Sequence, residues 1–171
     1  MSIKIIKKIS LILLFYFIFG ISNAEENLKQ LGKFKDWESF VLVQGENKIC
    51  YAQSIPVIRA PKKLKRDPSR LFVSFRPDEN IINEISVTNG YEFQPKTPVT
   101  AKSGKKAYDL FSKGRFAWVV DNEDEKKLIV TMRKAARLMI TGNSDQGNKT
   151  TDHYSMMGFT KAYSSAKKNC S

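Results

Sequence analysis

Short runs of alternating hydrophobic and polar residues, separated by turn residues, fill the chain from residue 36 to residue 141. The clearest run is 71–75, where every second side chain is hydrophobic and Pro77 follows as a breaker. A period of two places one set of side chains on one face of a β-strand. Further runs of this kind are 37–43, 48–54, 84–88, 99–102, 107–111, 115–121, 128–132 and 138–141. Their number and spacing predict an all-β antiparallel sandwich or barrel.

The segments between these runs have less regular patterns. Residues 55–70 hold three prolines and are predicted to form a loop, and residues 122–125 are predicted to form a polar turn. Residues 132–137 could continue a strand or form a helical turn. Residues 25–35 are interpreted as a flexible lead-in, so that residues 36–171 form a single domain.

The end of the chain changes to a helical period. Phe159, Tyr163, Ala166 and Cys170 recur on one helical face, and Thr160 is a candidate cap of the first turn. Three turns of helix are marginal in water, so this helix must dock on the rest of the domain. The second of the two cysteines is Cys50, which lies 120 residues upstream. We therefore predict a disulfide between Cys50 and Cys170.

The start of the chain has the features of a secretory signal peptide over residues 1–24. Lys4, Lys7 and Lys8 precede an apolar stretch at 9–19, and Ser22-Asn23-Ala24 resembles a cleavage site. The apolar stretch is shorter than the roughly 20 residues of a membrane-spanning helix. We expect cleavage after Ala24, export from the cytoplasm, and no transmembrane segment in the mature chain. Two cysteines in an exported chain agree with a structural disulfide.

The charge of the chain is strongly positive. Removal of residues 1–24 takes away three lysines, which lowers the formal net charge from +12 to +9 and leaves 147 residues. Six cations fall within residues 59–70, and we take them as a candidate anion-binding loop: Arg59, Lys62, Lys63, Lys65, Arg66 and Arg70. No aromatic residues are interleaved with them, which argues against a nucleic-acid site. The alternative is a solvated loop that keeps the protein soluble.

Signals for catalysis and for metal binding are weak. His153 is the single histidine and stands beside Asp152, with Ser155 close by, but adjacent residues of a strand point to opposite faces. The chain contains no G-x-S-x-G motif. The acidic stretch 121–125 lacks the alternating spacing of a calcium loop, and a solvated turn explains it. We predict no catalytic residues, no metal and no cofactor.

Several short motifs resemble a known family. They are DW at 36–37, KICYAQS at 48–54, AWVVD at 117–121, MRK at 132–134 and DHYSMMGFT at 152–160, followed by the terminal cysteine. Together they resemble the invasion-associated locus B family of exported bacterial proteins over nearly the whole mature chain. The chain departs from that pattern at His153, where threonine is usual, at Met156, where leucine is usual, and at 135–136, where a glycine is expected.

The resemblance implies an immunoglobulin-like β-sandwich, a periplasmic or surface location and no established enzymatic activity. We therefore expect a non-enzymatic binding or accessory protein that contacts an anionic component of the envelope or of a host surface. One alternative is an envelope assembly or structural factor with a protein partner. A further alternative is a periplasmic hydrolase with Ser155 or a similar residue as its nucleophile.

Overall fold

The computed structural model describes residues 26–171. The predicted signal peptide, residues 1–24, lies outside the described residues. The strands are β1 (Glu26–Phe34), β2 (Trp37–Gln44), β3 (Asn47–Ser54), β4 (Ile58–Ala60), β5 (Arg70–Arg76), β6 (Ile81–Thr88), β7 (Val99–Ser103), β8 (Lys106–Lys113), β9 (Phe116–Trp118), β10 (Arg137–Asn143) and β11 (Lys149–Ser155). The helices are the 3₁₀ turn η1 (Pro77–Glu79), α1 (Asn122–Lys134) and α2 (Phe159–Asn169). No helix within residues 26–171 has the length and apolar character needed to span a bilayer.

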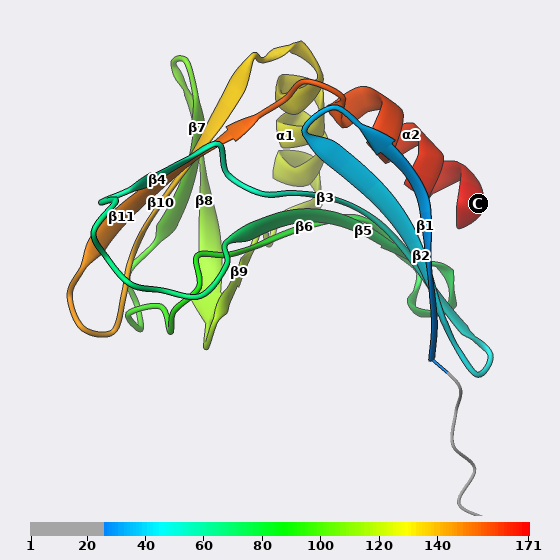
Figure 1. Cartoon of the computed structure of the whole chain (residues 1–171), viewed down its shortest axis with the longest axis horizontal. Helices are drawn as coiled ribbons and strands as arrows, with labels where there is room; N and C mark the ends of the chain where they lie inside the picture. The colour runs from blue at the N-terminus through cyan, green and yellow to red at the C-terminus, as the bar shows by residue number, and fades with distance from the viewer. Residues whose placement is uncertain (1–25) are drawn as a thin grey trace, which may run out of the picture.

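All strands belong to one antiparallel sheet. Its order is β1-β2-β3-β5-β6-β9-β8-β7-β10-β11-β4, which makes eleven strands. Strand β8 belongs to both halves, because its first part pairs with β7 and its last residues pair with β9. The sheet bends at β8, so that its two halves lie at an angle to each other (Figure 1). Both halves contribute to one hydrophobic core. The all-β antiparallel fold with a short C-terminal helix is confirmed.

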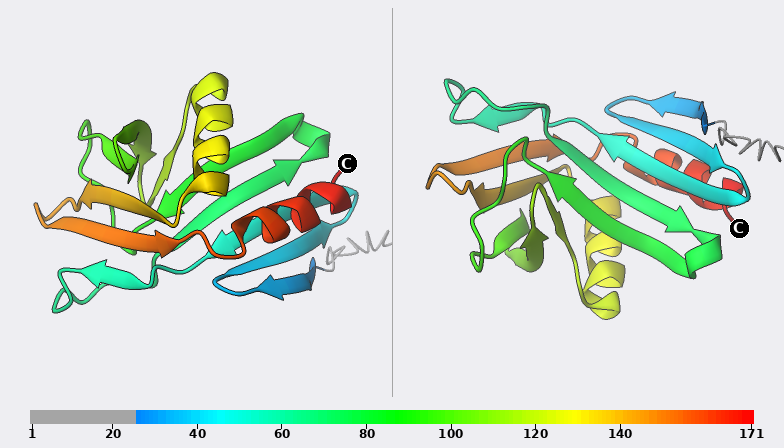
Figure 2. Two further views of the ribbon diagram at one scale, coloured as in Figure 1. Left: turned by 90° about the horizontal axis from the view of Figure 1, so that it is seen from above. Right: turned by 90° about the horizontal axis from the view of Figure 1, so that it is seen from below.

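Helix α2 covers one face of the first half of the sheet. It packs mainly on β2 and β3, and Figure 2 shows it on one side of these strands while the opposite side carries no helix of the described chain. Phe159 contacts Trp37 with 4.8 Å between ring centroids, and Tyr163 contacts Phe75 at 5.4 Å. Burial of these aromatic rings supplies the docking that a short helix needs.

The disulfide predicted from the sequence is confirmed. Cys50 and Cys170 are bonded, with their Cα atoms 5.8 Å apart. The bond ties the end of α2 to the middle of β3. The helix begins differently from the prediction, because Gly158 rather than Thr160 is its N-cap, and Thr160 is exposed.

The prediction of a polar turn at 122–125 and a strand at 128–132 is wrong. Both segments belong to α1, which begins after Asp121. The Asp121 carboxylate accepts hydrogen bonds from the backbone N–H groups of Glu123 and Asp124, which caps the helix. Leu128 and Met132 are buried at helical spacing, so the short alternation that suggested a strand was part of a period of 3.6.

Two strands replace segments that were interpreted as irregular. The prediction of a flexible lead-in at 25–35 is wrong for Glu26–Phe34, because these residues form β1 and pair with β2. Within the predicted loop 55–70, β4 pairs with β11. Both strands lie at the ends of the sheet, where main-chain pairing rather than a buried hydrophobic face holds the segment, so the sequence pattern is weak.

Candidate functional site

The loop between β4 and β5 carries most of the predicted anion-binding residues, and Arg66 anchors it internally. The Arg66 side chain is 2% exposed and forms an ion pair with Asp152 of β11, which is fully buried. Its Nη1 donates to Oδ2 of Asp152 at 2.7 Å, to the carbonyl of Asn89 at 2.6 Å and to Oγ of Ser69 at 2.9 Å. This buried, hydrogen-bonded pair fixes the loop to the sheet, so Arg66 cannot contact a ligand in solvent.

Arg59 also serves the loop itself. Its Nη2 donates to the backbone carbonyl of Asp67 at 2.5 Å and to that of Arg66 at 3.3 Å. The far end of the loop is held by an ion pair between Asp67 and Arg115. Two of the six predicted anion-binding residues, Arg59 and Arg66, therefore hold the loop in shape.

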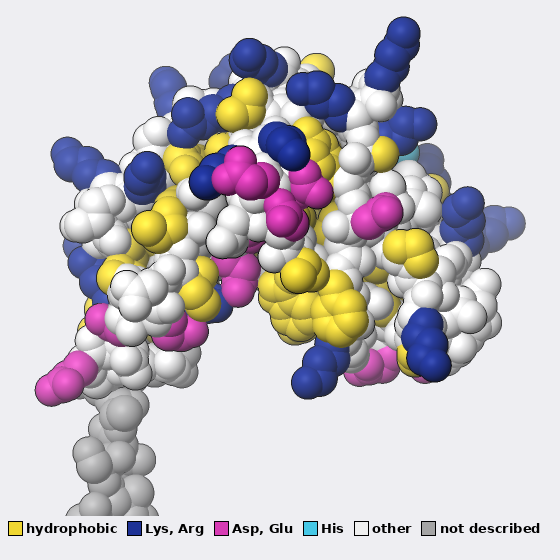
Figure 3. All heavy atoms as spheres, turned by 180° about the vertical axis from the view of Figure 1, so that it is seen from behind, with side chains coloured by type: hydrophobic (Ala, Val, Ile, Leu, Met, Phe, Trp, Pro, Cys, Tyr) yellow, Lys and Arg dark blue, Asp and Glu magenta, His cyan; other side chains and the backbone are white. Residues whose placement is uncertain are grey.

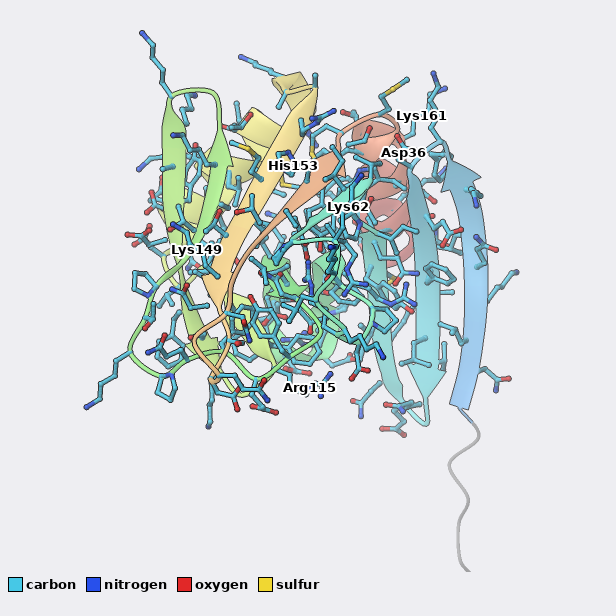
Figure 4. The ribbon with its side chains drawn as sticks, turned by 60° about the vertical axis from the view of Figure 1, so that its left-hand side comes forward. Asp36, Lys62, Arg115, Lys149, His153 and Lys161 are labelled. Atoms are coloured by element: carbon cyan, nitrogen blue, oxygen red, sulfur yellow. A yellow bond between two sulfur atoms is a disulfide. The ribbon has the colours of Figure 1, made fainter. Side chains whose placement is uncertain are left out.

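The other four cations face solvent or a cleft. Lys62, Lys63 and Lys65 are exposed, and Arg70 is half-buried at the start of β5. None of the four has an ion-pair partner within residues 26–171. Figure 4 shows Lys62 and Arg115 towards opposite ends of the region that the loop occupies. The loop thus presents its three lysines on a fixed scaffold.

An exposed apolar segment lies beside these cations. Ile55 and Val57 in the connection from β3 to β4 are 60% and 50% exposed, and Ile58 at the start of β4 is 39% exposed. Two hollows flank it and share Pro56 and Val57 in their walls. Large exposed apolar groups that lie together mark a binding surface more often than a solvated one.

The first hollow has a volume of about 410 Å³ and contains Arg70 together with Lys35 of the β1–β2 turn and Lys33 of β1. Its acidic groups include Glu38, which lies 3.4 Å from Lys33. The second hollow has a volume of about 370 Å³, and Lys62 is one of its lining residues. We call the combined surface the basic-apolar face; its residues are Lys33, Lys35, Ile55, Val57, Ile58, Lys62, Lys63, Lys65 and Arg70.

A row of aromatic rings continues from the first hollow across the helix-free face of the sheet. Phe40 stacks on Tyr51 at 5.2 Å, and Tyr51 meets the edge of Phe72 at 6.1 Å. Burial raises the pKa of the Tyr51 hydroxyl, and the positive charge of Arg70 opposes that shift. Tyr51 therefore stays neutral at physiological pH and adds apolar surface next to the guanidinium.

The residues considered for catalysis do not form a triad. The carboxylate of Asp152 is occupied by Arg66, and Oγ of Ser155 accepts a hydrogen bond from the backbone N–H of Met157 at 3.2 Å. Nδ1 of His153 is buried and has no hydrogen-bond partner within the described residues. Asp152 and Ser155 are therefore bound to other groups, and no hydrogen bond joins either of them to His153 within residues 26–171.

The acidic stretch before α1 has structural roles. Asp121 caps the helix, while Glu123 and Asp124 pair with lysines one turn further along. In the part of the chain that the structure describes, no group of three or more potential metal ligands comes together.

No protein-family model, curated protein or solved structure matches the chain.

Sequence reasoning identified the cations of the site but missed its apolar part. Residues 55–58 are three aliphatic residues and a proline without the alternation of a strand. Such a run next to a cluster of cations is a usable signal for an exposed, amphipathic contact surface. No such signal shows that Arg66 is buried while the neighbouring lysines are exposed, since its burial depends on the pairing with Asp152, 86 residues away.

Proposed function

We propose that this chain is an exported, non-catalytic binding protein of the bacterial envelope that holds anionic amphiphiles at its basic-apolar face. The observation that carries the proposal is that exposed apolar residues, Ile55, Val57 and Ile58, line two hollows together with the cations Arg70 and Lys62. A molecule with a phosphate group and an acyl chain offers both matching chemistries. Phospholipids and lipopolysaccharide share them.

The two parts of the face contribute in different ways. A lysine or arginine near an anionic lipid surface contributes about 1 kcal/mol, and this attraction weakens with salt. Insertion of apolar side chains contributes roughly 25 cal/mol per Å² and is insensitive to moderate salt. A face with both parts therefore binds lipid anions more tightly than either part alone.

The proposed location is supported by three features of the chain. Residues 1–24 have the pattern of an export signal. The Cys50–Cys170 disulfide is the kind of bond that persists outside the reducing cytoplasm. The resemblance to the invasion-associated locus B family points to the same compartment, where anionic lipids and lipopolysaccharide are abundant.

Co-sedimentation of the mature chain with vesicles tests this function. Binding should be strong to vesicles that contain an anionic phospholipid and weak to purely zwitterionic vesicles. Lys62→Glu, Lys63→Glu and Lys65→Glu together should reduce binding by more than about tenfold, because three attractive charges become repulsive.

A matched charge control is available on the β7–β8 hairpin. Lys102, Lys105 and Lys106 are exposed there and have no ion pairs among the described residues. The same triple change to glutamate alters the net charge equally but lies outside the basic-apolar face. If both triple variants lose binding to the same extent, only the net charge of the protein matters and the proposed site is wrong.

A further inference from the structure

A second exposed apolar surface lies on β6, β8 and β9. Phe111 and Trp118 are directly opposite each other on paired strands, and the rings of Phe116 and Trp118 lie 6.0 Å apart. Trp118 also lines a cleft of about 600 Å³ together with Ile82 and Val120. The last two are 64% and 72% exposed. Figure 3 shows hydrophobic side chains gathered at the lower middle of the molecule, below a group of acidic side chains.

The cleft exists because two paired strands separate there. Strand β9 pairs with β6 at Ser86 and Val87, and the backbone N–H of Val119 donates to the carbonyl of Ile85 at 3.2 Å before the chain turns into α1. The Glu125 carboxylate takes the place of the missing strand, since its Oε1 accepts a hydrogen bond from the backbone N–H of Ile85 at 3.0 Å. On this side, residues 81–84 have no strand neighbour within the described chain.

The charges of the cleft leave one carboxylate uncompensated. Glu84 is held by Arg76 through two hydrogen bonds, at 2.9 and 2.8 Å. Lys126 is paired with Glu123. Glu125 has no cationic partner within residues 26–171. The cleft of a strongly basic protein is therefore locally acidic, which favours a ligand that carries a cation.

The environment of Glu125 makes its charge sensitive to pH. Burial raises the pKa of this carboxyl to about 7, the hydrogen bond from Ile85 opposes the shift, and the charge of Glu84 adds to it. The nearby carboxylate of Asp121 is occupied as the cap of α1. A cation bound beside Glu125 would favour the ionised form.

We propose that this cleft binds an extended polypeptide segment whose apolar side chains cover the aromatic patch and whose lysine or arginine side chain pairs with Glu125. Residues 81–84 of β6 have no strand neighbour on this side, and Asn83, at a φ of +69°, makes a bulge in the stretch. An unpaired strand edge is where peptides add to a sheet. The amide side chains of Asn80 and Asn122 line the cleft and have the donors and acceptors that peptide groups need. An anionic lipid surface lacks the cation that the cleft requires.

Short capped peptides and the mature, disulfide-bonded chain provide the test. One peptide alternates leucine and lysine, the second alternates leucine and glutamate, and the third alternates serine and lysine. The measurement is the NMR shift of the backbone amides of residues 81–85 and of the Trp118 indole N–H during titration. We expect saturable shifts with the leucine–lysine peptide alone. Binding should weaken by about tenfold between about pH 8 and about pH 5.5, as Glu125 becomes protonated.

Variants separate the two parts of the cleft. Glu125→Gln keeps the shape and the acceptor of the Ile85 hydrogen bond, so it should weaken binding at high pH and abolish the pH dependence. Ile82→Ser with Val120→Ser should weaken binding at both pH values by more than about tenfold, because exposed apolar contacts are lost. Both residues are largely exposed, so the fold should persist.

The control variant is Ile55→Ser with Val57→Ser, which removes apolar surface from the basic-apolar face and should leave peptide binding unchanged. Equal binding of the leucine–glutamate peptide, shifts that map elsewhere, or unchanged binding by the Ile82→Ser, Val120→Ser variant would each overturn the proposal. Shifts of Trp118 caused by anionic vesicles instead of the peptide would identify the patch as a membrane contact and would also overturn it. Vesicle binding through the basic-apolar face is measured separately, so either proposal can fail alone.

Discussion

Replacement of Cys170 by serine removes the covalent link between α2 and β3 and should lower the stability of the whole domain. The bond closes a loop with a sequence separation of 120 residues. In the chain-entropy description, a loop of that length restricts the unfolded chain by about 5 kcal/mol at 25 °C. For a domain of this size, each kcal/mol corresponds to a change in Tm of about 2–4 °C, so we expect a fall of about 10–20 °C.

Loss of the disulfide should increase local opening first in α2, although the contacts of the helix with the sheet remain. Phe159 and Tyr163 stay packed on the core, and the Cys50 thiol that is left behind is fully buried as a small apolar group. Calorimetry gives Tm, and amide hydrogen exchange gives the local opening of residues 159–169. Wild-type protein unfolded under reducing conditions is the matched control and should melt with the variant. A decrease in Tm of less than about 3 °C would contradict the stabilisation expected from loop closure.

Three further predictions concern the interior of the domain. Because the pKa of Glu125 is raised to about 7, its contribution to stability is greatest below about pH 4.5 and is lost as the pH rises through 7. Denaturation at a series of pH values should show the unfolding free energy of the wild type falling by about 1–3 kcal/mol over this range, and the Glu125→Gln variant should not show this fall. Asp152→Ala leaves the Arg66 charge buried and unpaired, and urea denaturation should show a loss of about 3–5 kcal/mol, whereas a loss below about 1 kcal/mol would contradict the pairing. Gly158 has a φ of +94°, and a Cβ there would lie 1.7 Å from the carbonyl oxygen of Phe34, so Gly158→Ala should lower Tm measurably, and an unchanged Tm would contradict this close contact.

The strands of the central sheet could be predicted because burial on one face imposes a period of two. Leu71, Val73 and Phe75 lie at every second position of β5 and are buried. In α2, burial on one face imposes the helical period of 3.6 residues, which was also visible in the sequence. The first residues of α1 are polar, and most of them are charged, so a short window could not separate a helix start from a turn. Strand β1 carries few core residues and is held by pairing with β2, which the sequence does not display.

The site was predictable in its chemistry but not in its geometry. Six cations within residues 59–70 are equivalent in the sequence, yet the fold buries Arg66 and leaves Lys62 exposed. That difference arises from Asp152, which the topology brings to the loop from the other end of the chain. The apolar neighbours at 55–58 were overlooked because an aliphatic run next to prolines suggests a buried or irregular segment. Exposure is a tertiary property that local pattern does not fix.

The most direct test of the proposed function is to find which residues enter the lipid. The mature chain is bound to anionic vesicles that contain a nitroxide label in the acyl region, and the paramagnetic broadening of each backbone amide is measured by NMR. We expect the strongest broadening at Ile55, Val57 and Ile58, weaker broadening at Lys62–Lys65, and none at Phe111 or Val120. Broadening centred on Phe111 and Val120, or a complex with no broadening at residues 55–58, would contradict the proposed role of the basic-apolar face.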